Sequence, residues 1–214
     1  MKDFFVGLLD WVYKKKCYFC RRSHQSVKMC SECYDRLEHL SLKINRVVEG
    51  KKVYCCGVYS KDLQKLIRGL KYHKQRDLAH YQAKFMYEYW SKITTDKDFV
   101  VVPVPLHKNR MRKRKYNHMI LVGEEFCKLS GCGLNTELIK RIKDTAAQYK
   151  LSRAQRLKNL AGAFEIAAEA VVDGKILLID DICTTGSTFE EMIKEFKKHK
   201  INDIVCLATT TPFG

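Results

Sequence analysis

The sequence predicts an α/β fold built on a parallel sheet, with a small zinc-binding module at its N-terminal end. Strand-like apolar runs alternate with helical spacing along much of the chain, the pattern of βαβ units. Two closely spaced cysteine pairs lie before these runs, within residues 17–33. We therefore expect an N-terminal helix and zinc-finger module over residues 1–50 and an α/β domain over residues 51–214.

The expected elements follow from the spacing of apolar residues. An apolar stripe from Phe4 to Val12 predicts a helix that docks on its own domain. At about three turns, this helix is short for the alternative, an interfacial membrane anchor. We expect strands at residues 53–59, 99–104, 175–179 and 204–209, and helical segments at 63–70, 78–90, 117–129 and 187–198.

Composition narrows the classes of protein. Hydrophobic residues make up 46% of 214 residues, enough for a packed core. The net charge of +16 attracts polyanions, and nucleic acid, phosphorylated metabolites and anionic membranes all qualify. No export signal and no apolar run near the roughly 20 residues of a membrane span are present. We expect a cytoplasmic protein whose ten cysteines are metal ligands or reduced thiols.

The most informative segment runs from Lys175 to Thr188. Four apolar residues predict a strand buried on both faces, and the carboxylates of Asp180 and Asp181 follow it directly. Two adjacent like charges suit ligands such as a pair of ribose hydroxyls. The next loop opens a helix, where free N–H groups and the helix dipole bind phosphate. Its residues are Thr184, Thr185, Gly186, Ser187 and Thr188.

The same segment resembles the signature of the class I phosphoribosyltransferases from Ile176 to Thr188. The resemblance implies a phosphoribosyl pyrophosphate site. Asp180 and Asp181 would hold the ribose hydroxyls, and the loop from Thr184 to Thr188 would hold the 5′-phosphate. Magnesium would bridge ribose and pyrophosphate oxygens, because it favours hard oxygen ligands.

Two basic segments accompany this site. Between Asp98 and Glu124 there is no acidic residue, and the strand expected at 99–104 leads into this gap. A second segment, from Arg141 to Phe164, carries a single acid, Asp144. The segments are expected to bind pyrophosphate or a nucleic-acid backbone, a solvated basic face being the alternative. Their candidate residues are Lys108, Arg110, Arg112, Arg114, Arg153 and Arg156.

A closer resemblance is carried by the run from Val101 to His107, by Arg110, Arg114, Tyr116 and Asn117, and by the stretch from Arg141 to Phe164. These residues resemble the ComF family over nearly the whole chain. The resemblance implies a role in natural competence, contact with single-stranded DNA and a competence helicase as a partner. The chain departs from the family at Lys115 and His118, where glycine and glutamine are usual.

The four cysteines Cys17, Cys20, Cys30 and Cys33 form two knuckles of the C-x-x-C type. Two such knuckles place four thiolates around one ion, which predicts structural zinc. Cys55 and Cys56 are adjacent on an expected strand and therefore point to opposite faces of the sheet. Cys127, Cys132, Cys183 and Cys206 are expected to be packing residues.

The sequence thus favours a phosphoribosyl pyrophosphate-binding protein of the ComF type that handles single-stranded DNA. The main alternative is an active phosphoribosyltransferase that moves phosphoribosyl onto a base or amine. A regulator that senses phosphoribosyl pyrophosphate is a third possibility.

Overall fold

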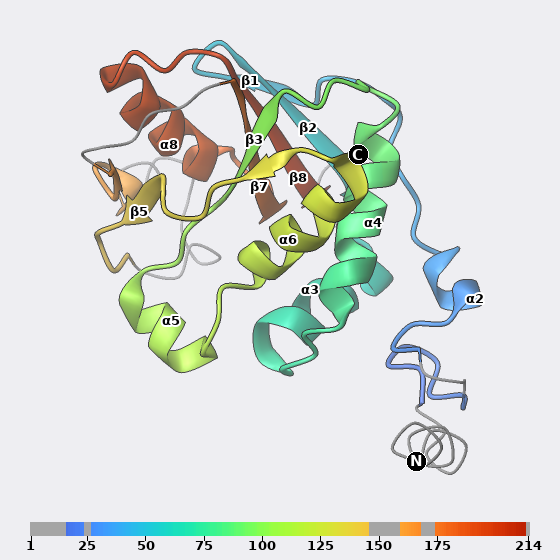
Figure 1. Ribbon diagram of the computed structural model, residues 1–214. Helices are drawn as coiled ribbons and strands as arrows, with labels where there is room; N and C mark the ends of the chain where they lie inside the picture. Colours follow the sequence, from blue (N-terminus) through green and yellow to red (C-terminus); the bar gives the residue numbers. More distant parts are fainter. Residues whose placement is uncertain (1–15, 24–26, 146–158, 168–173, 213–214) are drawn as a thin grey trace, which may run out of the picture.

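The computed structural model describes residues 16–23, 27–145, 159–167 and 174–212, and is shown in Figure 1. The expected helix at the N-terminus, Arg153 and Arg156 lie outside these ranges. None of the described helices combines the length and the apolar character that crossing a bilayer requires.

A six-stranded sheet forms the centre of the fold, in the order β1-β2-β8-β7-β3-β4. Only β1 is antiparallel to its neighbour, and the other pairs are parallel. The expected α/β fold with a mostly parallel sheet is therefore confirmed. The strands are β1 (Arg46–Val48), β2 (Lys51–Val58), β3 (Phe99–Pro103), β4 (Gly133–Leu134), β7 (Lys175–Ile182) and β8 (Ile204–Thr211).

Helices cover both faces of this sheet (Figure 1). Buried side chains of α3 (Lys61–Tyr72), α4 (Leu78–Trp90) and α6 (His118–Ser130) share one apolar cluster. Those of α8 (Ser187–Lys198) belong to a second cluster on the opposite face. Successive side chains of β7 point to opposite faces of the sheet. Leu177 and Ile179 therefore pack in the first cluster, and Ile176 and Leu178 pack in the second. In β2, Cys56 and Cys55 divide in the same way, as expected.

The cysteine module continues the first of these clusters. Cys17, Cys30 and Cys33 pack in it, together with the buried residues of α3 and α4. The short helix α2 (Ser31–Tyr34) follows Cys30, and Tyr34 Oη donates a hydrogen bond to Glu88 Oε2 in α4 at 2.9 Å. The module is thus anchored on the helices that cover one face of the sheet.

Besides α2, β1 and β4, three further short elements were not expected from the sequence. The helix α5 (Lys108–Arg114) follows β3, and β5 (Ile139–Arg141) pairs with β6 (Phe164–Ile166) in a small antiparallel sheet. Strands of three residues are too short to show a period-2 pattern. The helix α5 has no buried residue, so apolar spacing gives no sign of it.

Candidate functional site

A cavity of about 1110 Å³ opens where the parallel strands end. Tyr59 follows β2, Val104 follows β3 and Pro212 follows β8, and all three line the cavity. Ligands of open α/β sheets bind at this edge, where loops from several strands meet. Among the described residues, its lining holds two carboxylates, Asp180 and Asp181, and seven cations: Arg68, Lys71, Lys74, Arg110, Lys113, Arg114 and Arg141.

The two carboxylates lie at the end of β7. The sequence placed them just after a strand ending at Ile179, whereas β7 continues to Ile182. The reason is the neighbouring strand β8, whose Ala208 pairs with Asp180 and whose Thr210 pairs with Ile182. Pairing on this side fixes the backbone of both carboxylates in the middle of the sheet.

Asp181 is buried and holds two cationic or polar partners at one oxygen. Lys71 Nζ, from α3, lies 2.5 Å from Asp181 Oδ2, and His118 Nε2, from α6, lies 2.5 Å from the same atom. Burial raises the pKa of Asp181, but the charge of Lys71 and the hydrogen bond from His118 outweigh it and hold the pKa below its usual value. Asp181 is therefore an anion in the free protein.

Asp180 behaves in the opposite way. Burial and the adjacent negative charge of Asp181 raise the pKa of Asp180 to about 8. Its Oδ1 accepts a hydrogen bond from the backbone N–H of Asp181 at 2.8 Å. The pair therefore carries close to one negative charge at neutral pH, and a second charge becomes favourable when a ligand brings a cation.

His118 replaces the glutamine that is usual in the resembling family. It is only 2% exposed, and burial lowers the pKa of its ring, so the ring is neutral. Its Nδ1 atom is buried and has no hydrogen-bond partner among the described residues. In this residue, which lines the cavity, Nε2 bonds to Asp181 and Nδ1 has no described hydrogen-bond partner.

The hydroxyl-rich loop lies directly after the carboxylates. Gly186 is the N-cap of α8 with a φ of +84°, a left-handed conformation that glycine adopts without strain. Thr184 and Thr188 line the cavity, and the hydroxyls of Thr185 and Ser187 lie 2.6 Å apart. The N-terminus of α8 therefore presents backbone N–H groups and hydroxyls beside the two carboxylates.

The first basic segment is the helix α5, and only part of it reaches the cavity. Arg110, Lys113 and Arg114 line the cavity, whereas Lys108 and Arg112 do not. Positions two apart on a helix face away from each other, which explains the division. The sequence had treated these cations as one group.

The end of α5 explains one departure from the resembling family. Lys115 is the C-cap of α5 and has a φ of +68°, the left-handed region that favours glycine. The glycine usual in the family suits this conformation, and this chain keeps it with a lysine.

Two arginines converge beside the cavity on Thr145. Arg110 Nη2 donates to the Thr145 carbonyl oxygen at 2.9 Å, and Arg141 Nη2 donates to Thr145 Oγ1. Arg141 is 7% exposed, and burial together with the charge of Arg110 lowers its pKa to about 10. A cation buried as deeply as Arg141 favours an anion in the adjoining cavity.

Three of the lining cations come from α3 and the turn after it, and the sequence did not single them out. They are Arg68, Lys71 and Lys74, which follow one another at intervals of three residues. Apolar residues of α3 are buried on its other face. The basic stripe is thus a signal that the sequence carries, although its proximity to Asp181 depends on the tertiary fold.

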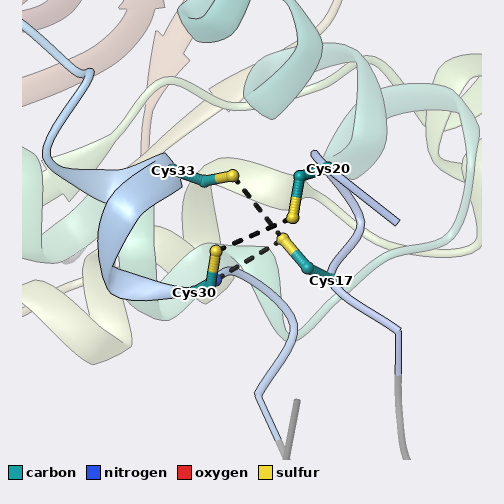
Figure 2. A group of neighbouring side chains, drawn as sticks. All are labelled: Cys17, Cys20, Cys30 and Cys33. Carbon is teal, nitrogen blue, oxygen red and sulfur yellow. Dashed lines mark hydrogen bonds between the residues drawn. The ribbon is translucent and has the colours of Figure 1, made fainter. Parts of the chain in front are cut away.

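The four cysteine sulfurs lie together, as Figure 2 shows. All are within 4.8 Å of one another, and the pairs Cys17–Cys33 and Cys20–Cys30 have Sγ–Sγ distances of 3.8 Å. A tetrahedron with zinc–sulfur bonds of about 2.3 Å has sulfur–sulfur edges of about 3.8 Å. The expected grouping is confirmed, and it is compatible with structural zinc.

Donors around the cluster suit thiolates. The backbone N–H groups of Phe19 and Cys30 donate to Cys17 Sγ at 3.4 and 3.5 Å, and Arg36 Nη1 donates to Cys33 Sγ at 3.4 Å. Hydrogen bonds of this kind orient metal ligands and balance their charge.

Comparison with curated proteins finds relatives over most of the chain. DNA utilization protein YhgH of Salmonella typhimurium is 28% identical over 186 residues, which cover 82% of this chain and 81% of that protein. Competence protein F of Haemophilus influenzae is 25% identical, covering 88% and 86%. Competence protein ComFC of Bacillus subtilis is 27% identical, covering 80% and 67%. The chain is thus similar, over most of its length, to proteins named for competence and DNA utilization.

No family model matches the chain. Solved structures similar to it include adenine phosphoribosyltransferase of Thermoanaerobacter pseudethanolicus, with a TM-score of 0.40, 14% identity and coverage of 84% of this chain and 98% of that one. Hypoxanthine phosphoribosyltransferase of Staphylococcus aureus has a TM-score of 0.38 and 15% identity, with coverage of 62% of each chain.

Proposed function

We propose that this ComF-type protein binds phosphoribosyl pyrophosphate with magnesium and handles single-stranded DNA in natural competence. One observation carries the proposal. Asp180 and Asp181 lie beside the hydroxyl-rich start of α8, in a cavity whose other charged lining residues, within the described part of the chain, are cations. A ligand that suits this arrangement carries hydroxyls at one point and phosphate groups on either side of them.

The ribose hydroxyls are assigned to Asp180 and Asp181, because each carboxylate accepts hydrogen bonds from a diol. The 5′-phosphate is assigned to the loop from Thr184 to Thr188, at the N-terminus of α8. Pyrophosphate is assigned to the cations on the α5 side of the cavity, with Arg110, Arg114 and the deeply buried Arg141 as its partners.

Magnesium fits the same carboxylates. Asp180 and Asp181 supply hard oxygen ligands, and a bound cation would favour ionisation of Asp180, whose pKa burial and the charge of Asp181 raise. The ion would neutralise pyrophosphate charge while the carboxylates orient the ribose. In the free protein, Lys71 Nζ supplies a positive charge at Asp181 Oδ2, so this oxygen already binds a cationic group.

The role in DNA handling rests on charge and on the relatives. The chain has a net charge of +16, and its curated relatives are called competence and DNA utilization proteins. The exposed cations of α5 that face away from the cavity are available to a phosphate backbone. A competence helicase as protein partner stays a prediction, as does the cytoplasmic location.

Structural zinc is proposed for the cluster of Cys17, Cys20, Cys30 and Cys33. The tetrahedral sulfur spacing and the N–H donors support it. The ion would fix the knuckles against α3 and α4, with whose residues the cysteines share a core.

Calorimetry with phosphoribosyl pyrophosphate and magnesium tests the ligand. Asp180→Asn combined with Asp181→Asn is expected to abolish binding. The neutral amides lack the negative charge that attracts magnesium and that strengthens the hydrogen bonds from the two ribose hydroxyls. Unchanged affinity in that variant would remove the assignment. Titration of labelled single-stranded DNA with and without the ligand then tests the DNA role and any coupling between the two.

An active transferase is favoured by one further observation. The cavity volume of about 1110 Å³ lies just above the range of typical ligand sites, roughly 300–1,000 Å³. Tyr59 and Tyr72 line it and offer aromatic surface to a base. Release of pyrophosphate in the presence of bases or amines would establish this activity, and its absence across them would favour the binding protein.

A further inference from the structure

A second hollow adjoins the large cavity, where the cysteine module meets α3. Its volume is about 330 Å³. Gln64 and Arg68 line both hollows, so a chain-like ligand can pass from one to the other across the face of α3. The second hollow is lined by Tyr18, Arg21, Gln64, Lys65, Arg68 and His73.

The charge of this hollow is entirely positive. Arg21, Lys65 and Arg68 belong to its lining, and none of its described lining residues is an Asp or Glu. Arg21 and Arg68 are exposed, while Lys65 is half-buried. Three cations without an acidic neighbour in the lining create a potential that attracts an anionic ligand.

Tyr18 contacts two of these cations, Arg21 and Lys65. Its Oη lies 2.5 Å from His73 Nδ1, and the guanidinium carbon of Arg21 lies 5.8 Å from the centre of its ring. Lys65 Nζ lies 5.6 Å from the same centre and donates a hydrogen bond to the Phe19 carbonyl at 2.9 Å. Cation–π contacts of this kind fix charged groups before a ligand arrives.

The contact between the module and α3 is close. A Cβ atom built on Gly69 would lie 3.1 Å from Tyr18 Cε1, so the tyrosine ring packs directly on the helix. The hollow is therefore formed by two segments held in a fixed relation, and its cations keep their spacing.

We infer that this second hollow binds the phosphodiester backbone of single-stranded nucleic acid. The inference rests on the proposed function and names a path for the strand: from the large cavity, across Arg68 and Lys65 of α3, to Arg21 on the cysteine module. An acidic peptide would use the same charges. The adjoining sugar- and phosphate-binding site favours nucleic acid, because a strand presents sugars and phosphates at both hollows. Because Arg21 and Lys65 lie over the ring of Tyr18, the ring is not open for a base to stack on it. The strand is therefore bound through its phosphates, independently of its base sequence.

The test compares two variants of equal charge. One combines Arg21→Gln, Lys65→Gln and Arg68→Gln, and the other, the control, combines Lys84→Gln, Lys128→Gln and Lys198→Gln on the outer sides of α4, α6 and α8. Each is titrated with fluorescent thymidine 30-mer across a salt series, after circular dichroism and zinc content have been matched to the unmodified protein.

The first variant is expected to lose affinity and to flatten the slope of log affinity against log salt by about 2, at about 0.7 per lost phosphate contact. The control should lie close to the unmodified protein. Superimposable titrations of the two variants would overturn the inference while leaving DNA binding itself intact. Absence of DNA binding by the unmodified protein would instead overturn the DNA role in the proposed function.

A measurement on the unmodified protein avoids any effect of substitution on folding. Modification of arginine by phenylglyoxal, mapped by mass spectrometry, should be slowed at Arg21 by the 30-mer and not by phosphoribosyl pyrophosphate, since Arg21 lines only the second hollow. Equal modification with and without DNA would contradict the proposed path. Displacement of the 30-mer by polyglutamate at equal charge concentration would assign the hollow to acidic proteins.

Discussion

Lys71 Nζ and His118 Nε2 meet at a single oxygen of Asp181, each at 2.5 Å. The two residues come from α3 and α6, so this atom joins two helices to the end of the central strand β7. The free protein thus gives Asp181 a cation and a ring nitrogen as partners, whereas no described side chain bonds to Asp180 in the same way.

This asymmetry predicts opposite effects of two similar substitutions on stability. Asp180→Asn should raise the thermal midpoint of the ligand-free protein, because it removes a carboxyl group that burial and Asp181 disfavour as an anion. Asp181→Asn should lower the thermal midpoint, because Lys71 and His118 lose their buried partner. The expected loss of unfolding free energy is about 1–3 kcal/mol. Scanning calorimetry without added magnesium measures both. A fall in stability of equal size in the two variants would contradict the asymmetry.

The metal assignment predicts one zinc ion per chain in purified, reduced protein. Cys33→Ser should lose the ion and unfold at a lower temperature, because the cluster closes the module against α3 and α4. Cys132→Ser, a buried cysteine outside the cluster, is the matched control and should keep its zinc. Elemental analysis decides, and a folded protein without zinc would refute the assignment.

The two sides of α5 are expected to serve different ligands. Arg110→Ala with Arg114→Ala removes cations that line the cavity, and should weaken phosphoribosyl pyrophosphate binding. Lys108→Ala with Arg112→Ala removes cations that do not line it, and should leave that binding unchanged. The second pair should flatten the salt dependence of DNA binding by about 1.4, for two lost phosphate contacts. A DNA titration that matches the unmodified protein would exclude this side of α5 from the DNA surface.

Gly186 is expected to be required for the phosphate loop. A Cβ atom there would lie 2.9 Å from Val48 Cγ2, and the φ of +84° adds backbone strain. Gly50 has a similar φ of +76° but nothing within 4 Å of its added Cβ atom, so it isolates the strain alone. Gly50→Ala should cost about 1–2 kcal/mol. Gly186→Ala should cost more and should weaken phosphoribosyl pyrophosphate binding, measured by denaturant melts and calorimetry. Equal costs with unchanged binding would show that the loop tolerates the methyl group.

The ion pair of Asp96 with Lys175 predicts a pH dependence of stability. Lys175 Nζ donates to Asp96 Oδ2 at 2.6 Å and lowers the pKa of that carboxyl group. A carboxyl group with a lowered pKa in the folded protein stabilises it above the unfolded pKa of about 3.9, and the effect is lost as pH falls through the folded value. Asp96→Asn should therefore lower the urea midpoint at pH 7 and converge with the unmodified protein below about pH 4. A difference that persists at low pH would show that the effect is not electrostatic.

The sequence predicted the sheet, its main helices and the site on β7 because the signals there are local. The carboxylates and the phosphate loop are contiguous, so one segment from Asp180 to Thr188 carries both. Lys71 precedes Asp181 by 110 residues (181 − 71), and nothing in α3 alone indicates that the two side chains meet. His118 was noticed only as a departure from the resembling family, and its hydrogen bond to Asp181 depends on how α6 packs. Arg141 required the pairing of β5 with β6, which is too short for a periodic signal.

The shared core of the cysteine module and α3 has a thermodynamic consequence. Cys17 and Cys33 pack in the same cluster as Leu66 and Leu70, and α3 also carries Lys71 to the carboxylates. Any change in the position of α3 therefore alters the free energy of both sites, and heterotropic linkage requires the effect to be reciprocal. By whatever factor zinc tightens the binding of phosphoribosyl pyrophosphate, the ligand must tighten the binding of zinc by the same factor. If zinc favours ligand binding, a chelator that removes zinc weakens the binding of the sugar phosphate without contacting its site.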